Sequence, residues 1–396
     1  MRRMMPDPAF TAVTERLAPA TFFTHLTSAA MVKVRRHALA SLAVMCLLLV
    51  ACAGGPAEFA LYDPAPAQGS VVPILAITPR KPVDDPKLRY GDGRNSDLSY
   101  ADIDVWVPDD RKLGTIKPPS HTPDPSSEFG VTGIDEVASE SDALARINAQ
   151  LKRLPPDDRI VMIFIHGYNV SYVSGIYRQA QLIHDFDQPV VGIHYSWPSA
   201  GKTSAYLYDR DSVQFARDGL QRTIELAARS NARTVAVVAH SMGTLLTMEA
   251  VRQLSLSNKK SALKRISPLV LASPDIDGDV FRSQISVIEP KPSPFVVLAS
   301  RKDKALKISR DLRGGTSRIG QGDDIEALQE LGITVVDLSE ITDGQDGASH
   351  ATFANSPTLI RLIQSGAISP ASLPENREAF ARRVGDGVAD MLFLGN

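Results

Sequence analysis

The stretch TVAVVAHSMGTLL, residues Thr234–Leu246, decides the fold. Its first half is a run of β-branched and small apolar residues, which predicts a buried strand, and its second half has the apolar spacing of a helix. Ser241 lies at the sharp turn between the two. Such a turn brings the residues two positions before and after the serine close together, so both must be small, as Ala239 and Gly243 are.

Strand-like and helix-like segments alternate from about Val71 to Gly366. Three apolar runs, RIVMIFIHGYN, QPVVGIHYSWP and RISPLVLASPDID, are continuous rather than alternating, which is typical of parallel strands buried on both faces. We therefore expect one α/β domain over residues 71–366, with helices near 172–185, 211–230 and 244–254. The tail, residues 367–396, is predicted to form a helix that packs on this domain; the alternative is a partner-binding segment.

The composition is that of a soluble globular protein. Of 396 residues, 43% are hydrophobic and 22% charged, and the formal net charge is −2, without the basic stripe of a nucleic-acid-binding protein. Both cysteines, Cys46 and Cys52, lie near the N-terminus, so the rest of the chain has no disulfide and no thiolate metal site. HExxH, P-loop and dinucleotide-binding motifs are absent, so we expect no metal and no cofactor. The oligomeric state stays unknown.

The N-terminal region has the order of a secretory signal. Residues 31–51 begin with basic side chains, continue with an apolar run and end in small residues. The sequence LVAC resembles the lipobox of bacterial lipoproteins, which implies a lipid on Cys52, and Ala53 after it implies the periplasmic face of the outer membrane. The alternative is a membrane-anchoring helix that is not removed.

Two further segments flank this signal. Residues 1–30 look unlike any part of it, and we expect a non-native upstream extension, with Met31 as the true start. Residues 52–70 are rich in Pro, Gly and Ala, which predicts a flexible tether between the anchor and the domain.

The segment AHSMG resembles the nucleophile elbow of α/β-hydrolases, in a form familiar in bacterial lipases. Together with ILAITPR, HGYN, YSWPS, SPDID, SRKDKALKISR and GASHATF, it resembles a bacterial family of α/β-hydrolases of unassigned function, over about Val71–Gln364. The resemblance implies the α/β-hydrolase fold, a mostly parallel sheet flanked by helices, with Ser241 as nucleophile. Only about 16 residues, Asp279–Pro294, separate two expected strands, so we expect no large lid domain.

A serine nucleophile needs a base and an acid that orients the base. α/β-Hydrolases order these as serine, acid, histidine along the chain. Of eight histidines, only His350 follows Ser241, so it is the predicted base. Asp303, after the strand PFVVLAS, is the predicted acid, and Asp275, one strand earlier, is the alternative.

The sequence also predicts groups around the serine. In this family the oxyanion hole uses the backbone N–H after the nucleophile, here that of Met242, and an N–H from the loop after the third strand, here that of Tyr168 in HGYN. Trp197, Tyr206 and Tyr208 are candidates for lining the substrate pocket, with packing at the rim as an equal alternative.

These residues predict an esterase-like or lipase-like serine hydrolase of carboxylic esters, which forms an acyl-enzyme. Its substrate would be a small-molecule or lipid ester, and a lipid anchor would hold it in the cell envelope. An acyltransferase, thioesterase or peptidase would use the same residues. A non-catalytic binding module on a hydrolase fold is the further alternative.

Overall fold

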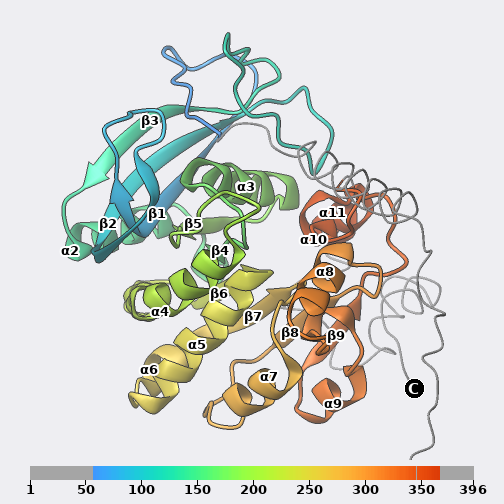
Figure 1. Ribbon diagram of the computed structural model, residues 1–396. Helices are drawn as coiled ribbons and strands as arrows, with labels where there is room; N and C mark the ends of the chain where they lie inside the picture. Colours follow the sequence, from blue (N-terminus) through green and yellow to red (C-terminus); the bar gives the residue numbers. More distant parts are fainter. Residues whose placement is uncertain (1–56, 345, 366–396) are drawn as a thin grey trace, which may run out of the picture. The chain divides into compact units, whose positions relative to one another are not determined.

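The computed structural model describes residues 57–344 and 346–365 (Figure 1). The expected upstream extension, the signal, Cys52 and the tail over residues 367–396 lie outside these residues. Within them, no helix has both the length and the apolar character needed to cross a bilayer.

A single nine-stranded sheet organises the described residues, in the order β3-β2-β1-β5-β4-β6-β7-β8-β9. Only β2 runs against its neighbours, so the sheet is mostly parallel. The strands are β1 (Ser70–Pro82), β2 (Tyr90–Val107), β3 (Gly130–Val137), β4 (Ile160–Ile165), β5 (Val190–Tyr195), β6 (Thr234–His240), β7 (Ile266–Ala272), β8 (Phe295–Ala299) and β9 (Thr334–Asp337).

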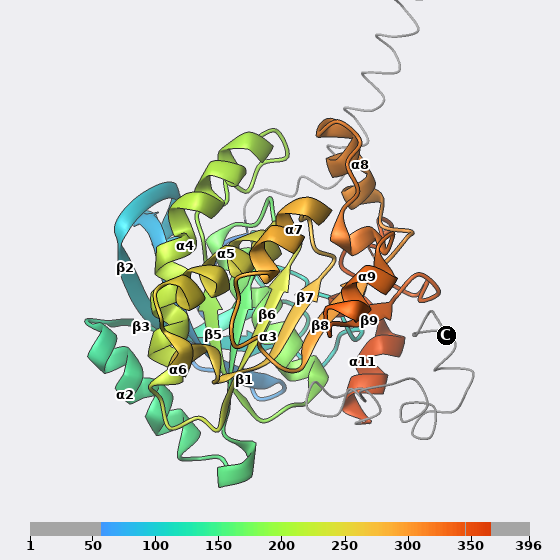
Figure 2. The ribbon, with the colours of Figure 1, turned by 90° about the horizontal axis from the view of Figure 1, so that it is seen from below.

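Helices cover both faces of this sheet (Figure 1, Figure 2). Side chains of α2, α4, α5 and α7 form one apolar core with the sheet, and those of α3, α10 and α11 pack against its other face. The helices are α2 (Glu140–Leu151), α3 (Tyr172–Phe186), α4 (Tyr206–Ala228), α5 (Met242–Leu256), α6 (Lys260–Leu263), α7 (Gly278–Ile285), α8 (Lys304–Leu312), α9 (Ile325–Glu330), α10 (Thr352–Asn355) and α11 (Pro357–Gln364).

The expected fold class is confirmed: this is an α/β-hydrolase fold. The connection between β7 and β8 holds the short helix α7 and turns, which leaves no room there for a large lid domain. The strand β3 was not expected, because its two glycines weaken the strand pattern of GVTGIDEV.

The prediction of a flexible tether over residues 52–70 is wrong for residues 57–70, the part of this segment that the structure describes. The Phe59 ring is buried and lies 5.8 Å from the Tyr177 ring of α3, centroid to centroid. The backbone N–H of Tyr62 donates to the carbonyl of Val131 in β3 at 2.8 Å. These two aromatic side chains bury enough apolar surface to hold a Pro- and Gly-rich segment against the domain.

Candidate active site

Ser241 occupies a strained turn between β6 and α5. Its backbone angles are φ 52° and ψ −124°, a conformation that costs a residue with a side chain of order 1–3 kcal/mol. A Cβ on Gly243 would overlap the carbonyl oxygen of His166 and lie 2.9 Å from that of Ile165, so position 243 needs glycine. The methyl group of Ala239 is fully buried within the core. The turn therefore accepts alanine before the serine but only glycine after it.

The loop after β4 lies directly against this turn. A Cβ on Gly167 would be 2.9 Å from the Cβ of Ser241 and 3.0 Å from Nδ1 of His240. Among the described residues, neither the Tyr168 N–H nor the Met242 N–H donates a hydrogen bond. Two free N–H donors in the segments that meet at the serine are what a developing oxyanion requires.

His350 and Asp303 are joined by a hydrogen bond, with Nδ1 of the ring 2.7 Å from Oδ2 of the carboxylate. The Asp303 side chain is fully buried, whereas 18% of the His350 side chain is exposed. The other oxygen of Asp303 accepts from the Leu306 N–H at 2.9 Å, as the N-cap of α8. Both carboxylate oxygens are therefore held in place, one by the helix and one by the imidazole.

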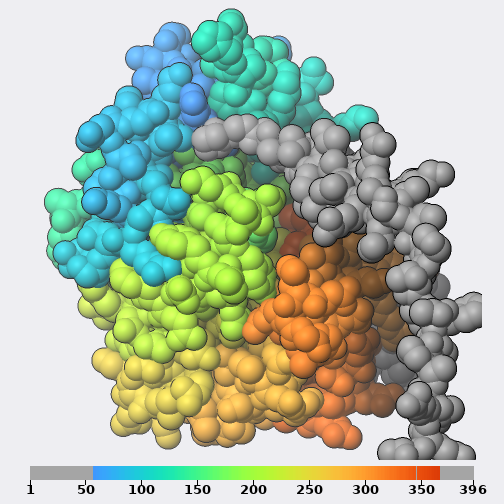
Figure 3. All heavy atoms as spheres, viewed as in Figure 1, coloured from blue at the N-terminus to red at the C-terminus, as the bar shows by residue number. Residues whose placement is uncertain are grey.

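Asp275, the alternative acid, lies in a different cluster. Its carboxylate accepts hydrogen bonds from the Ser309 hydroxyl at 2.7 Å and from the Tyr206 hydroxyl at 3.0 Å. These partners belong to α8 and α4, which meet in Figure 3 where the orange and yellow-green surfaces touch. The buried Arg318 guanidinium approaches the same carboxylate at 3.4 Å. The structure thus pairs His350 with Asp303 and not with Asp275.

The charges around His350 favour its protonated form. Burial lowers the pKa of His350, but the hydrogen bond and charge of Asp303, helped by the charge of Asp275, outweigh burial and leave that pKa above its ordinary value. A base with a raised pKa is a stronger proton acceptor.

The backbone of His350 is fixed by three side chains. Its carbonyl accepts from Nε2 of His240 at 3.0 Å and from the Ser273 hydroxyl at 3.0 Å, and its N–H donates to Asp346 at 2.7 Å. Burial and the charge of His350 hold the pKa of His240 well below its ordinary value. Because a carbonyl only accepts, the neutral His240 ring carries its proton on Nε2.

The His350 ring contacts the residue that precedes Ser241, and no hydrogen bond joins Ser241 to His350 within the described residues. The ring centroid of His350 lies 4.7 Å from that of His240, the residue before the serine. The Asp275 N–H, two residues beyond Ser273, donates to the Ser241 carbonyl at 3.4 Å. Nucleophile and base often come into hydrogen-bond distance only when substrate is bound.

Residues 139–366, more than half of the chain, match the family described as "Alpha/beta hydrolase of unknown function (DUF900)". The chain belongs to this family. No curated protein matches the chain's sequence. All the candidate reacting groups of this α/β-hydrolase, Tyr168, Ser241, Met242, Asp303 and His350, lie within the matched residues.

Solved structures similar to this α/β-hydrolase include two fungal enzymes. Lipase B of Aspergillus fumigatus has 16% identity and a TM-score of 0.36, over 58% of this chain and 57% of the lipase. Carboxyl esterase 2 of Tuber melanosporum has 12% identity and a TM-score of 0.36, over 78% of this chain and 89% of the esterase. Similarity this low carries no argument about the activity or substrate of this hydrolase.

Of the two roles predicted for Trp197, lining a pocket or packing at the rim, the described structure shows packing. Trp197 is fully buried, its indole N–H donates to the His166 carbonyl at 2.7 Å, and its ring stacks on the His166 ring at 4.9 Å. The amphipathic indole therefore packs under the loop after β4 and supports it. The motif YSWPS alone does not show on which side of the loop the Trp197 side chain lies.

The two predicted tyrosines mainly join structural elements. Tyr206 bonds Asp275, and its ring lies edge-on to that of Tyr168 at 5.5 Å. The Tyr208 hydroxyl donates to the carbonyl of Asp92 at 2.6 Å, and its ring lies under the Arg94 guanidinium. These contacts match the alternative of packing at the rim.

A buried arginine that the sequence did not reveal holds the loop after β4. The Arg80 guanidinium donates to the carbonyls of Val170 at 2.8 Å and Ser199 at 2.9 Å. Its Nη2 lies 3.4 Å from Nε2 of His166. Burial lowers the pKa of Arg80 to about 10, against the opposing charge of Asp209. Arg80 lies near the end of β1, and the sequence around it gives no sign of the carbonyl groups that it meets in the fold.

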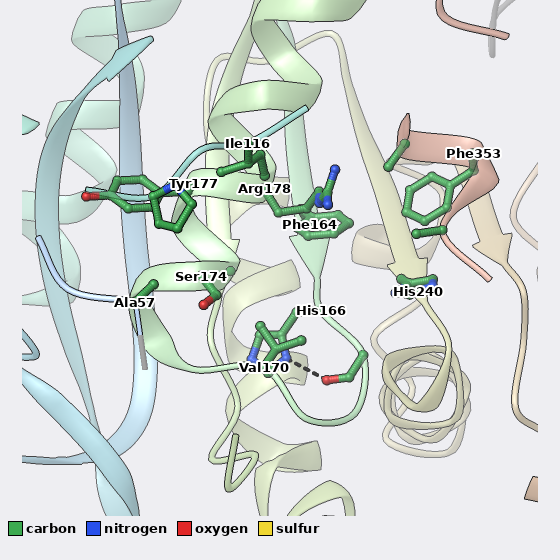
Figure 4. Close-up of a pocket in the computed structure, with 15 residues that line it drawn as sticks. Ala57, Ile116, Phe164, His166, Val170, Ser174, Tyr177, Arg178, His240 and Phe353 are labelled. Atoms are coloured by element: carbon green, nitrogen blue, oxygen red, sulfur yellow. Dashed lines mark hydrogen bonds between the residues drawn. The ribbon is translucent and has the colours of Figure 1, made fainter. Parts of the chain in front are cut away.

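Beside the serine turn this hydrolase has a cavity of about 300 Å³ (Figure 4). Gly167 and His240 form the wall nearest the serine, and α3 contributes Tyr177 and Arg178. None of Trp197, Tyr206 and Tyr208 lines it. Its remaining walls include Phe164, Phe353, Ile116 and Pro118.

The last two of these wall residues come from the loop over residues 108–129, which a buried ion pair fastens to α3. The Arg111 guanidinium bonds the fully buried carboxylate of Asp185. The same carboxylate accepts from the Gly114 N–H at 2.8 Å. A charged pair that is both buried and hydrogen-bonded in this way holds the loop in one position.

Proposed function

We propose that this α/β-hydrolase is a serine hydrolase of carboxylic esters, with Ser241 as nucleophile, His350 as base and Asp303 as the acid that orients the base. The observation that carries the proposal is the backbone of Ser241, strained at φ 52° at the end of a parallel strand. Strain of this kind persists where the surrounding structure maintains it, and it gathers at reacting residues.

The hydrogen bond between His350 and Asp303 supports the assignment of the base. A carboxylate only accepts, so Nδ1 of His350 carries the proton and Nε2 has a free lone pair. That lone pair takes the hydroxyl proton of Ser241 as its oxygen attacks the ester carbonyl. The N–H groups of Tyr168 and Met242 then donate to the carbonyl oxygen as it becomes negative.

Collapse of the tetrahedral intermediate completes the first half of the reaction. The C–O bond to the alcohol breaks, and His350 gives its proton to the leaving oxygen. A water molecule then attacks the acyl-serine as His350 accepts its proton, the bond between the acyl carbon and the Ser241 oxygen breaks, and His350 returns the proton to that oxygen as the carboxylic acid leaves. The raised pKa of His350 suits both steps, because the same ring must first accept and then donate a proton.

Labelling with a fluorophosphonate probe tests the proposal on the full chain. We expect wild type to be labelled on Ser241, and the folded variants Ser241→Ala and His350→Ala to stay unlabelled. Ser257→Ala, at the far end of α5, is the matched control and should label as wild type does. A folded wild type that neither labels nor cleaves a panel of 4-nitrophenyl esters would show the proposal to be wrong.

We also propose, from the sequence alone, that Cys52 carries a lipid that holds the domain at the outer membrane. The basic start, the apolar run and LVAC support this. Expression in a bacterium with Cys52→Ser tests it by membrane fractionation and by the mass of the mature N-terminus. A wild-type protein that keeps residues 31–51 and carries no lipid would instead favour an anchoring helix.

A further inference from the structure

Arg178 brings an unbalanced positive charge to the cavity beside Ser241. Figure 4 shows its side chain running from α3 toward Phe164 at the cavity. Its Nη1 donates to the side-chain carbonyl of Gln181 at 2.8 Å, and it forms no salt bridge within the described part of the chain. The guanidinium has five N–H donors, so most of them are available to another acceptor.

The two carboxylates whose charges act on Arg178 are already engaged elsewhere. Asp185 is bonded by Arg111 and by the Gly114 N–H. Asp346 accepts three backbone N–H groups, from Ser349 through Ala351, at 2.6–2.9 Å. Neither carboxylate forms a salt bridge with Arg178 within the described residues.

The walls around Arg178 provide little solvation for its charge. Phe164, Phe353 and Ile116 are apolar, and the neighbouring His240 ring is neutral. Burial lowers the pKa of Arg178 to about 10, so the half-buried guanidinium stays charged at neutral pH. A cation in this state gains more from an anionic partner than a fully hydrated cation does.

The cavity lies beside the turn that carries Ser241. Gly167, which lines it, approaches Ser241 so closely that an added Cβ would be 2.9 Å from the serine Cβ. His240, which also lines it, directly precedes the serine. Two residues of the cavity wall therefore flank Ser241, which places the cavity next to the serine turn. The volume of about 300 Å³ is at the lower end for small-molecule sites, about 300–1,000 Å³, which suits a short substituent.

We propose that Arg178 binds an anionic substituent of the substrate, so that this hydrolase prefers short esters bearing a carboxylate or a phosphate. The inference rests on the proposed function, because it takes Ser241 as the reacting residue. Carboxylate and phosphate share the planar or near-planar pair of oxygens that a guanidinium binds through two N–H groups. Carboxylate and phosphate would be carried by different parts of the ester. A dicarboxylic monoester carries its charge on the acyl side, and a phosphorylated glycerol ester carries it on the alcohol side.

Two matched substrate pairs test the proposal. The first is mono-4-nitrophenyl glutarate against 4-nitrophenyl pentanoate, and the second is dihexanoyl phosphatidate against dihexanoylglycerol. We expect wild type to favour the anionic member of at least one pair in kcat/KM by about 10-fold or more, as a charge-assisted hydrogen bond provides. The pair that shows the preference identifies whether the acyl or the alcohol side enters the cavity.

Variants then assign the preference to Arg178. Arg178→Gln should lower the ratio of anionic to neutral kcat/KM by about 10-fold or more, and Arg178→Lys should retain part of it. Arg153→Gln, at an exposed arginine, is the matched control and should keep the wild-type ratio. A hydrolase that cleaves both members of both pairs equally, or keeps its preference in Arg178→Gln, would overturn the inference and leave ester hydrolysis standing.

Calorimetry on the Ser241→Ala protein separates the two proposals. We expect monomethyl glutarate to bind at least 10-fold more tightly than methyl pentanoate, and the difference to vanish when Arg178→Gln is added. If no ester is cleaved but this difference is found, the anion site stands and ester hydrolysis fails. If neither cleavage nor the binding difference is found, both proposals are wrong.

Discussion

The Nε2 atom of His240 donates a hydrogen bond of 3.0 Å to the backbone carbonyl of His350. His240 is the last residue of β6, and His350 belongs to the loop that follows β9. The residue before the candidate nucleophile therefore positions the segment that carries the candidate base. Ser273, directly after β7, donates to the same carbonyl at 3.0 Å, so two strand ends fix one backbone group.

Removing the His240 donor should slow the reaction while the protein stays folded. His240→Phe keeps an aromatic ring against Phe353 but leaves the His350 carbonyl with Ser273 alone. We expect kcat to fall about 10-fold, and the double variant with Ser273→Ala to lose more than the product of the single effects, because the carbonyl then has no donor. Ester hydrolysis by the single and double variants measures this. His121→Phe, at an exposed histidine, is the control, and an unaltered kcat in His240→Phe would refute the positioning role.

Replacing the two candidate acids should have unequal effects. Asp303→Asn keeps an oxygen to cap α8 but cannot hold the His350 imidazole in the reactive tautomer, so kcat should fall about 10³–10⁴-fold. Asp275→Asn alters contacts with Tyr206 and Ser309 and should lower kcat less than 10-fold. Steady-state kinetics with 4-nitrophenyl butyrate, on variants shown to be folded by circular dichroism, compares them. The reverse order of effects would make Asp275 the acid.

The pH dependence should report the titration of His350. The base must be unprotonated and its pKa is raised above 6.5, so kcat/KM should rise with pH and reach half its maximum above pH 6.5. Asp275→Asn removes a negative charge that contributes to this raised pKa, so the midpoint should move to lower pH. Profiles from pH 4.5 to 9 measure both. Asp279→Asn, at an exposed carboxylate, should keep the wild-type midpoint, and a shift to higher pH in Asp275→Asn would contradict the assignment.

An alanine at Gly167 should impair the reaction more than the fold. Its Cβ would press on Ser241 and His240 at 2.9 and 3.0 Å, which displaces the loop that carries the Tyr168 N–H. Loss of one oxyanion donor typically costs about 10²–10³-fold in kcat, and we expect a fall in that range. Gly133→Ala is the control, because its Cβ would lie 3.5 Å from the nearest atom, an ordinary contact. Equal kcat values in the two variants would exclude Tyr168 as an oxyanion donor.

The fold could be predicted because continuous apolar strands alternate with amphipathic helices from β4 to β9. The turn around Ser241 could also be predicted, because it requires small residues two positions before and after the serine, and these are close in the sequence. The choice between Asp303 and Asp275 could not be settled in this way. Both follow strands that end at the same edge of the sheet, and order along the chain does not say which loop reaches His350.

Other features depend on contacts between distant segments. The sequence allowed Trp197 either to line a pocket or to pack at the rim, and in the structure its indole packs beneath His166. Arg178 and Arg80 looked like ordinary charged residues, and only the folded chain shows one lining a cavity and the other buried under a loop. Phe59 looked like part of a tether because its neighbours are Pro, Gly and Ala, and composition averages hide a single aromatic side chain.

Three residues that line the cavity beside Ser241, Ala57, Ile116 and Pro118, precede the stretch that matches the family, residues 139–366. The candidate reacting groups all lie within that stretch. Arg178, which lines the same cavity, lies within the matched stretch, so the cavity combines side chains from both portions of the polypeptide, which the ion pair between Arg111 and Asp185 joins. A chimaera that exchanges residues 57–138 for those of another family member would alter the shape of this cavity while keeping both Ser241 and Arg178.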